Sequence, residues 1–386
     1  MRASKVVDAD GHILEPGSLW LDNLEPKYRD RAMRISKGED QLEYLEIEGK
    51  KSQVLNGGLL GGLGGLDEEI SKRTKDGFVP GSLDWEISQI PGGTDPHARI
   101  EWNDAHGIDI ALIYPSLGLN WQSECGDAEL AAAHSRAYNN WITDFCKPYP
   151  DRLIAIASIS LMNVDEGVKE IRRAAKLGVK GVYLFPNPTN GVPYGDKYYD
   201  PFWAECEEMG LPLGIHVSST PKHVGHELYP SSWTVNPWFF NVYFNGDCQL
   251  AFTSFFQGAV FDRFPKLSVG VVETGCGWMA HWLYLMDEKL DRRDGYKGYI
   301  TDTEMKLLPS EYFERQCWVT GEADEPAFPH MAELIGAHKL SWGSDYPHPE
   351  GHGDPLDSLK ETISSLSEAD QAKILGENMM REYHLN

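Results

Sequence analysis

The sequence predicts a (β/α)8 barrel, because eight short apolar runs alternate with helix-like segments along its 386 residues. Each run is followed by turn residues and then by helical periodicity, which is the pattern of a parallel sheet wrapped by helices. Such a barrel needs roughly 250 residues, so the chain is long enough for one that carries an insertion. We expect a single domain over residues 1–386. An open, doubly wound sheet is the structural alternative.

The predicted strands have the length and the β-branched or apolar composition of buried strands. Helices are expected between them, and two have clear ends. The helix from Val164 to Leu177 stops before Gly178, and the helix from Asp200 to Met209 stops before Gly210. The strands are expected at residues 5–10, 108–114, 153–158, 179–185, 211–216, 267–273, 317–320 and 339–345.

The segment between the first two strands, about residues 13–107, is too long for a simple connection and must contain an insertion. Within it, residues 41–55 alternate in polarity around Glu48 and Gly49 and predict a β-hairpin. Residues 57–65 are all glycine or leucine, and no Gly-Lys-Ser/Thr follows, so they do not form a phosphate loop. This run fits either a mobile flap near the pocket mouth or a plain connecting loop.

The overall charge excludes two classes of partner. The formal net charge of −24 repels nucleic acid and anionic membrane surfaces, so the expected partner is a small-molecule substrate. An acidic substrate would need a metal ion or a specific arginine inside the pocket. The six cysteines form no C-x-x-C pair, which argues against a zinc ribbon or a disulfide framework. With no signal-like segment and no long apolar run, we expect a cytoplasmic protein.

Polar side chains stand at the carboxyl ends of four predicted strands. Asp10 and His12 end the first, His216 the fifth, Glu273 the sixth and Asp345 the eighth. These ends share one rim of a barrel, where catalytic groups lie. Each residue alone could be a cap or a simple hydrogen-bonding group. Together they would bury so much charge that a cation or paired partners must compensate it, and a cation is the expectation.

We therefore expect one divalent ion held by Asp10, His12, His216 and Asp345. With no thiolate in the set, Zn²⁺ is the first expectation and Mn²⁺ the second. Such an ion lowers the pKa of bound water towards ~7 and polarises a substrate oxygen, which allows hydrolysis or metal-assisted C–C cleavage.

Several motifs resemble the amidohydrolase-related family that includes aminocarboxymuconate-semialdehyde decarboxylase and the resorcylate and carboxyvanillate decarboxylases. The resemblance spans most of the chain and implies a distorted (β/α)8 barrel, one catalytic divalent metal and, in many members, a homodimer. It rests on the segments Val7–His12, Gly107–Asp109, Gly214–His216, Phe261–Leu267 and Trp342–His348.

The resemblance also implies the same four ligands, Asp10, His12, His216 and Asp345. The sequence departs from the family at the sixth strand, where these decarboxylases carry a histidine and this chain has Glu273. Glu273 could ligate the metal, act as a general base or support a neighbour through a hydrogen bond. A carboxylate there would repel the carboxylate of a decarboxylase substrate, which favours hydrolysis.

Three functions therefore remain open. The first is a hydrolase in which Glu273 or Asp345 deprotonates metal-bound water for attack on a carbonyl carbon, with His216 also at the reacting centre. The second is non-oxidative decarboxylation of an aromatic or muconate-type acid, and the third is a catalytically silent barrel that binds a ligand. His348 is a candidate acid or substrate contact. His223 and His226 are weaker candidates in the loop after the fifth strand.

Overall fold

Eight parallel strands form the centre of the computed structural model, in the order β1-β5-β6-β7-β8-β9-β10-β11. The structure describes residues 5–55, 57–65, 70, 72, 78–221, 223–225, 228, 229, 239, 242, 243, 245–290, 304–349, 351 and 353–386. The eight predicted strands are all present. Their bounds are β1 Val7–His12, β5 Ile110–Tyr114, β6 Leu153–Ser158, β7 Gly181–Leu184, β8 Leu213–His216, β9 Val269–Val272, β10 Cys317–Glu322 and β11 Leu340–Gly343.

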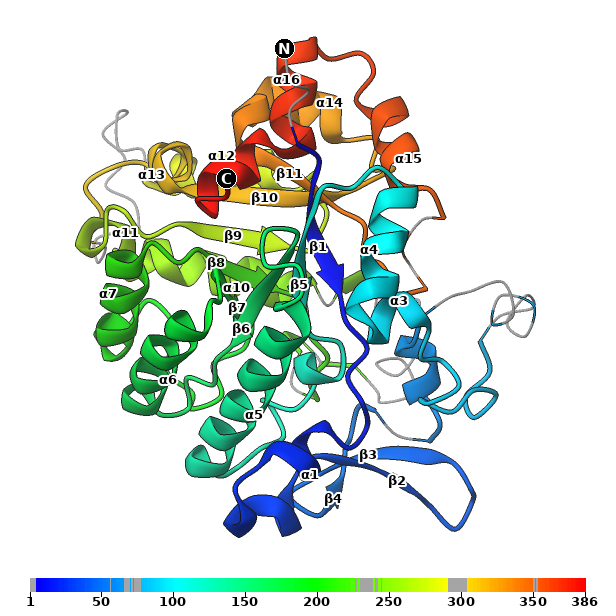
Figure 1. Cartoon of the computed structure of the whole chain (residues 1–386). Helices are drawn as coiled ribbons and strands as arrows, with labels where there is room; N and C mark the ends of the chain where they lie inside the picture. The colour runs from blue at the N-terminus through cyan, green and yellow to red at the C-terminus, as the bar shows by residue number, and fades with distance from the viewer. Residues whose placement is uncertain are drawn as a thin grey trace.

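The first and last strands meet, so the sheet forms a nearly closed barrel (Figure 1). The N–H of Asp345 donates to the carbonyl of Asp10 at 2.8 Å, and the N–H of His12 donates to the carbonyl of Tyr346 at 2.8 Å. These bonds join the end of β1 to the segment that follows β11. The predicted (β/α)8 barrel is confirmed, and the open-sheet alternative is wrong.

Alternating side chains fill the barrel, because successive residues of a strand point to opposite faces. Val7 and Ala9 of β1 share one buried cluster with Tyr114 of β5 and Trp318 of β10. Large side chains fit where the opposite strand is small: a Cβ on Gly214 would lie 2.6 Å from the Tyr114 hydroxyl. The interior is therefore packed, and the polar site lies at the carboxyl ends of the strands.

Helices cover the outside of the barrel, and α5, α6 and α7 lie beside one another in Figure 1. The two helices with predicted ends have the predicted bounds. The main helices are α4 Pro96–Ala105, α5 Ala128–Cys146, α6 Val164–Leu177, α7 Asp200–Met209, α10 Asn245–Gln257, α12 Met279–Leu290, α13 Pro309–Gln316 and α15 Pro355–Thr362. Shorter helices are α1 Leu19–Asn23, α3 Pro91–Thr94, α11 Val260–Arg263, α14 Phe328–Met331, α16 Glu368–Ala372 and α17 Asn378–Glu382.

Helix α6 shows why these segments are helical. The side chain of Asn163 accepts hydrogen bonds from the N–H groups of Asp165 and Glu166, which satisfies two free donors of the first turn. Gly178 ends the helix at a φ of +111°, a conformation that costs glycine little. The face that carries Ile171 is buried against the barrel.

The insertion after β1 contains a small antiparallel sheet of β2 Arg34–Lys37, β3 Glu43–Ile47 and β4 Lys50–Lys51. The predicted hairpin is the pair β3 and β4, and its turn residues Glu48 and Gly49 both have positive φ. Strand β2 was not expected, because Arg34–Lys37 is polar and only half-buried.

The glycine and leucine run packs closely against residues 81–90 of the same insertion. A Cβ on Gly61 would lie 2.2 Å from the carbonyl oxygen of Leu83, and one on Gly64 would lie 1.9 Å from the Ser88 hydroxyl. Only glycine lets the two backbones approach this closely. The packing fits a connecting loop better than a flap.

All six cysteines are buried and unpaired. Among the helices of the described residues, none combines the length and the apolar character that a membrane span requires.

Candidate metal centre

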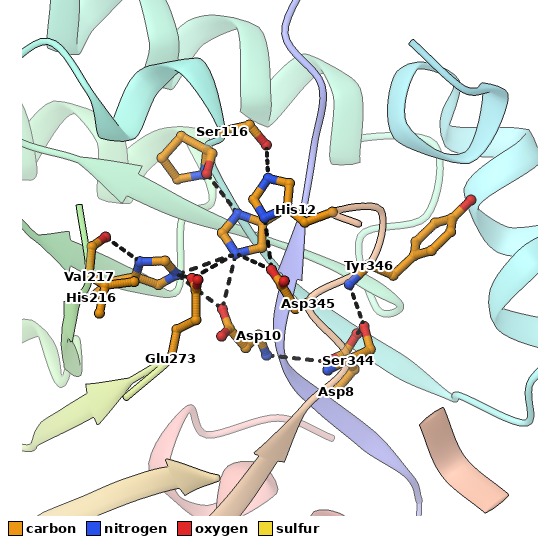
Figure 2. Close-up of polar contacts among 12 residues, drawn as sticks. Asp8, Asp10, His12, Ser116, His216, Val217, Glu273, Ser344, Asp345 and Tyr346 are labelled. Carbon is orange, nitrogen blue, oxygen red and sulfur yellow. Dashed lines mark hydrogen bonds and ion pairs between the residues drawn. The ribbon is translucent and has the colours of Figure 1, made fainter. Parts of the chain in front are cut away.

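Five polar side chains converge at one end of the barrel (Figure 2). Asp10 and His12 belong to β1, and His216 ends β8. Glu273 directly follows β9, and Asp345 lies two residues beyond β11. The carboxyl ends of parallel strands share one rim, and this brings together residues far apart in the sequence.

The two histidines present their Nε2 atoms to one another. His12 donates its Nδ1–H to the carbonyl of Pro115 at 2.7 Å, and His216 donates its Nδ1–H to the carbonyl of Val217 at 2.8 Å. These bonds leave Nε2 as the lone-pair atom of each neutral ring. The two Nε2 atoms are 3.3 Å apart. Two lone pairs at this distance repel unless a cation, either protons or a metal ion, lies between them.

Carboxylate oxygens surround these nitrogens. An oxygen of Asp10 lies 3.3 Å from His12 Nε2 and 3.2 Å from His216 Nε2. An oxygen of Glu273 lies 3.0 Å from His216 Nε2 and 3.7 Å from His12 Nε2, and that of Asp345 lies 3.5 Å from His12 Nε2. The buried Glu273 Oε2 has no hydrogen-bond donor in the described part of the chain. This donor set fits a divalent metal ion.

The four closest donors are not the four ligands expected from the sequence. Asp10, His12, His216 and Glu273 each offer an atom within 4.8 Å of the others, whereas Asp345 groups with His12 and His348. Asp345 remains beside the centre, and its role as a ligand stays a prediction. Glu273 joins the centre as a further carboxylate.

The electrostatics of the site also call for positive charge. Burial by itself would lower the pKa of His12 and His216, but the carboxylates of Asp10 and Glu273 outweigh it. The pKa of His12 rises well above its ordinary value, and that of His216 rises to about 10. Burial would raise the pKa of Asp10 and Glu273, but the histidines hold both below their ordinary range. A bound metal ion would replace the imidazole protons.

Glu273 and Asp345 both have strained backbones. Their φ angles are +55° and +54°, a region that costs a non-glycine residue about 1–2 kcal/mol. Glu325 braces the loop after Glu273 by accepting hydrogen bonds from the N–H groups of Cys276 at 2.8 Å and Gly277 at 2.7 Å. Such strain concentrates at functional sites, where surrounding contacts enforce it.

A chain of hydrogen bonds leads away from Asp345. Its carboxylate lies 2.8 Å from Nδ1 of His348, and Nε2 of His348 lies 2.6 Å from the Ser116 hydroxyl. The His348 ring packs on that of His12, with centroids 4.1 Å apart. Burial holds the pKa of Asp345 above its ordinary value, and Glu273 adds to this effect while His348 opposes it. Asp345, His348 and Ser116 can therefore pass a proton along one path.

The Ser–His–Asp order resembles a nucleophilic triad, but the backbone around Ser116 does not. The N–H groups of Ser116, Leu117 and Gly118 donate to the buried carboxylate of Glu15 at 3.1, 2.9 and 3.0 Å. These donors are not available to stabilise an oxyanion. The chemistry that this arrangement supports is proton transfer through His348.

Sequence reasoning missed several supporting residues. Asp8 accepts hydrogen bonds from the N–H and the hydroxyl of Ser344 at 2.9 and 2.7 Å, which holds β1 against the segment after β11. The register of β1 shifts between Asp8 and Gly11, so simple alternation along the strand does not place Asp8 with Asp10 and His12 and gave no signal for this role. Ser116 carried no signal either, because its contact with His348 spans 232 positions.

Glu322 is a further missed acid at the end of β10. It continues the inward-facing positions of Trp318 and Thr320. Burial raises its pKa well above the ordinary value, and the carboxylates of Asp345 and Glu273 raise it further. Burial is the main cause of this shift, and the negative charge of the rim adds to it.

His223 supports its loop. Its Nδ1–H donates to Asp247, and its Nε2 accepts the N–H of Thr220 at 3.2 Å. Both nitrogens are occupied, which fits a structural role. His226 lies outside the described residues.

Curated relatives support an enzymatic role. The chain is 27% identical over 324 residues to 2-amino-3-carboxymuconate-6-semialdehyde decarboxylase of Dictyostelium discoideum, covering 83% of this chain and 84% of that protein. It is 25% identical over 322 residues to gamma-resorcylate decarboxylase of Rhizobium sp. (strain MTP-10005), covering 80% of this chain and 93% of that protein. These similarities support the decarboxylase alternative better than hydrolysis.

Solved structures share the fold. An amidohydrolase from Mycobacterium avium subsp. paratuberculosis K-10 superposes with a TM-score of 0.78 at 23% identity, covering 99% of this chain and 100% of that one. A dihydroxybenzoic acid decarboxylase from Polaromonas sp. JS666, with bound manganese and the inhibitor 2-nitroresorcinol, gives 0.67 at 18% identity, covering 99% of this chain and 98% of that one. The amidohydrolase family model matches residues 91–385. The chain belongs to this amidohydrolase family.

Proposed function

We propose that this protein is a metal-dependent, non-oxidative decarboxylase of a small aromatic or muconate-type acid. The observation that carries the proposal is the chain Asp345–His348–Ser116, with contacts of 2.8 and 2.6 Å, beside the metal centre. Decarboxylation needs a proton at the carbon that loses carbon dioxide, and these three hydrogen-bonded residues can deliver one. The decarboxylases among the relatives support the same reaction.

The proposed ion would be held by Asp10, His12 and His216, and the carboxylates of Glu273 and Asp345 are two further donors beside these ligands. Five donors exceed the four of a tetrahedral zinc site, and a carboxylate-rich set suits Mn²⁺. The manganese in the Polaromonas enzyme supports this choice. We therefore propose Mn²⁺ ahead of the Zn²⁺ that the sequence first suggested.

The reaction assigns distinct roles to the residues. The bound ion would supply the positive charge that holds the substrate's oxygens and withdraws electrons from its conjugated carbons. The C–C bond to the carboxyl group breaks, carbon dioxide leaves, and the electron pair stays on the carbon that bore the carboxyl group. That carbon takes one proton from the Asp345–His348 pair, which Ser116 then helps to reload.

Hydrolysis remains the second candidate, and Glu273 favours it. Its carboxylate stands where the related decarboxylases have a histidine, 3.0 Å from His216 Nε2. A carboxylate in this place can accept a proton from water. The relatives make this reading weaker than decarboxylation, and the convergent donors make a silent barrel weaker still.

The decisive assay incubates the manganese-loaded protein in D₂O with 2,6-dihydroxybenzoate, 2-hydroxybenzoate and other phenolic acids. We expect release of carbon dioxide and one deuterium at the vacated carbon, detected by mass spectrometry and proton NMR. A metal-loaded protein that hydrolyses aryl esters or amides but releases no carbon dioxide from such acids would contradict the proposal. A homodimer and a cytoplasmic location also remain predictions, the first testable by light scattering.

A further inference from the structure

Arg99 is a fully buried cation beside the metal centre. It belongs to α4, at the end of the insertion, and its side chain is 0% exposed. Its Nη1–H donates to the backbone carbonyl of His12 at 2.5 Å, and its Nε–H donates to the side chain of Asn103 at 3.2 Å. Burying a guanidinium is costly, so these contacts call for an explanation.

The same guanidinium also contacts the segment that carries Asp345. It lies 4.9 Å from the ring centroid of Tyr346, a cation–π contact. The Tyr346 ring stacks on Trp102 of α4, with centroids 3.6 Å apart and an interplanar angle of 10°. The carbonyl of Tyr346 in turn accepts the N–H of His12 at 2.8 Å. Arg99 therefore touches two of the segments that supply the metal centre, the end of β1 and the segment after β11.

The middle residue of Asp10-Gly11-His12 makes room for this contact. A Cβ on Gly11 would lie 2.4 Å from Arg99 Nη2 and 3.0 Å from a carboxylate oxygen of Asp8. A larger residue between the two predicted ligands would displace the guanidinium, and it would also press on the Asp8 carboxylate. Gly11 therefore leaves the space that the guanidinium of Arg99 occupies.

We propose that Arg99 is a positioning residue that holds the metal-ligating segments of β1 and β11 in register. It fixes the carbonyl of His12 directly and supports Tyr346 from the side, so that Asp10, His12 and Asp345 face one ion. This inference rests on the metal centre of the proposed function, but not on the reaction. It assigns to α4 of the insertion a role in metal binding.

The test measures the dissociation constant of Mn²⁺, and of Co²⁺ as a spectroscopic probe, by competition with a chelator. Loss of a residue that orients metal ligands weakens binding by about 10–100-fold, and we expect this for Arg99→Lys. Gly11→Ala should weaken binding to a similar degree by displacing the guanidinium. Because both substitutions act through one contact, the double variant should weaken metal binding by less than the product of the two single fold-changes.

Arg152→Lys is the matched control, since Arg152 also donates to backbone carbonyls, those of Asp109 and Ile108, but away from the centre. Its metal affinity should match the wild type. Urea unfolding of each metal-free variant separates lost affinity from lost stability, and Gly11→Ala carries the test if Arg99→Lys does not fold.

Two results would overturn the inference while leaving the metal centre intact. One is tight metal binding by the wild type with an Arg99→Lys or Gly11→Ala value within twofold of it. The other is a double variant whose loss of metal affinity equals the product of the two single losses. A wild type that binds metal but does not decarboxylate contradicts the proposed reaction alone.

Discussion

The Nε2 atoms of His12 and His216 lie 3.3 Å apart, and each ring is fixed in this orientation by a hydrogen bond from its Nδ1 to a backbone carbonyl. This arrangement is unfavourable for two neutral imidazoles and favourable around a cation. The strands that end here are buried and parallel, so the fold itself imposes the arrangement. Positive charge at this point is therefore a structural requirement.

Glu273→Gln and Asp345→Asn should separate metal binding from proton transfer. The Glu273 oxygen is close to both histidines, whereas Asp345 is tied to His348. We expect Glu273→Gln to weaken metal affinity more than Asp345→Asn, and Asp345→Asn to lower kcat by about 10²–10⁴-fold even when metal is saturating. Chelator competition and steady-state kinetics give the two readouts. The reverse order of affinities would make Asp345 the stronger ligand.

Ser116→Ala should slow turnover without loss of metal. Removing the hydroxyl leaves Nε2 of His348 without its 2.6 Å partner and interrupts the path by which the pair regains its proton. We expect kcat to fall by about 10-fold, at the weak end of proton-transfer effects, with KM little changed. Ser123→Ala, on the same loop, serves as the control. Unaltered kcat in Ser116→Ala would remove Ser116 from the path.

Gly214→Ala should disturb the metal centre through the packing of Tyr114 in the barrel interior. The new methyl group would meet the Tyr114 hydroxyl at 2.6 Å, and the Tyr114 ring stacks on His216 with centroids 5.0 Å apart. Overpacking of this kind costs about 1–3 kcal/mol, and part of it should appear as weaker metal binding. Gly246→Ala is the control, because nothing lies within 4 Å of its Cβ position. Equal stability of the two variants by urea unfolding would contradict this packing argument.

His134 should make stability depend on pH. It is buried, donates to the carbonyl of Leu130 and accepts the N–H of Met33. Burial lowers its pKa to about 4, whereas the unfolded chain takes up that proton near pH 6.5. Between these values the unfolded state binds more protons, so the free energy of unfolding falls as pH falls, by up to about 1.4 kcal/mol per unit.

The measurement is urea unfolding of the metal-free protein from pH 7.5 to 4.5. The stability that neutral His134 contributes should be fully present above pH 6.5 and should be lost as the pH falls towards 4, a decrease of about 3 kcal/mol. This decrease should be absent in His134→Gln. His338→Gln, at a half-exposed site, should keep the wild-type slope. Parallel slopes in the wild type and His134→Gln would show that His134 is not the titrating group.

The barrel and its rim were predictable from local patterns. Buried strands such as Leu153–Ser158 have a clear composition, and helices such as Val164–Leu177 have a cap at each end. Once eight strands are placed in order, the residues at their carboxyl ends must meet. The convergence of Asp10, His12, His216, Glu273 and Asp345 was therefore predictable from their positions at the ends of strands.

The supporting contacts were not predictable in the same way. Arg99 reaches the carbonyl of His12 across 87 positions, and no local pattern marks an arginine that will be buried. Strand β2 is polar and depends on its neighbour β3 for its conformation. The reaction could not be predicted from the sequence either, because the carboxylate of Glu273 can bind a metal ion or accept a proton.

Metal content of the purified protein tests the central claim most directly. Elemental analysis after dialysis against Mn²⁺ should give about one ion for each folded chain, and His216→Ala should reduce it to near zero while its circular dichroism stays that of the wild type. His338→Ala should keep the ion. A wild-type protein that is folded and binds neither Mn²⁺ nor Zn²⁺ would contradict the account.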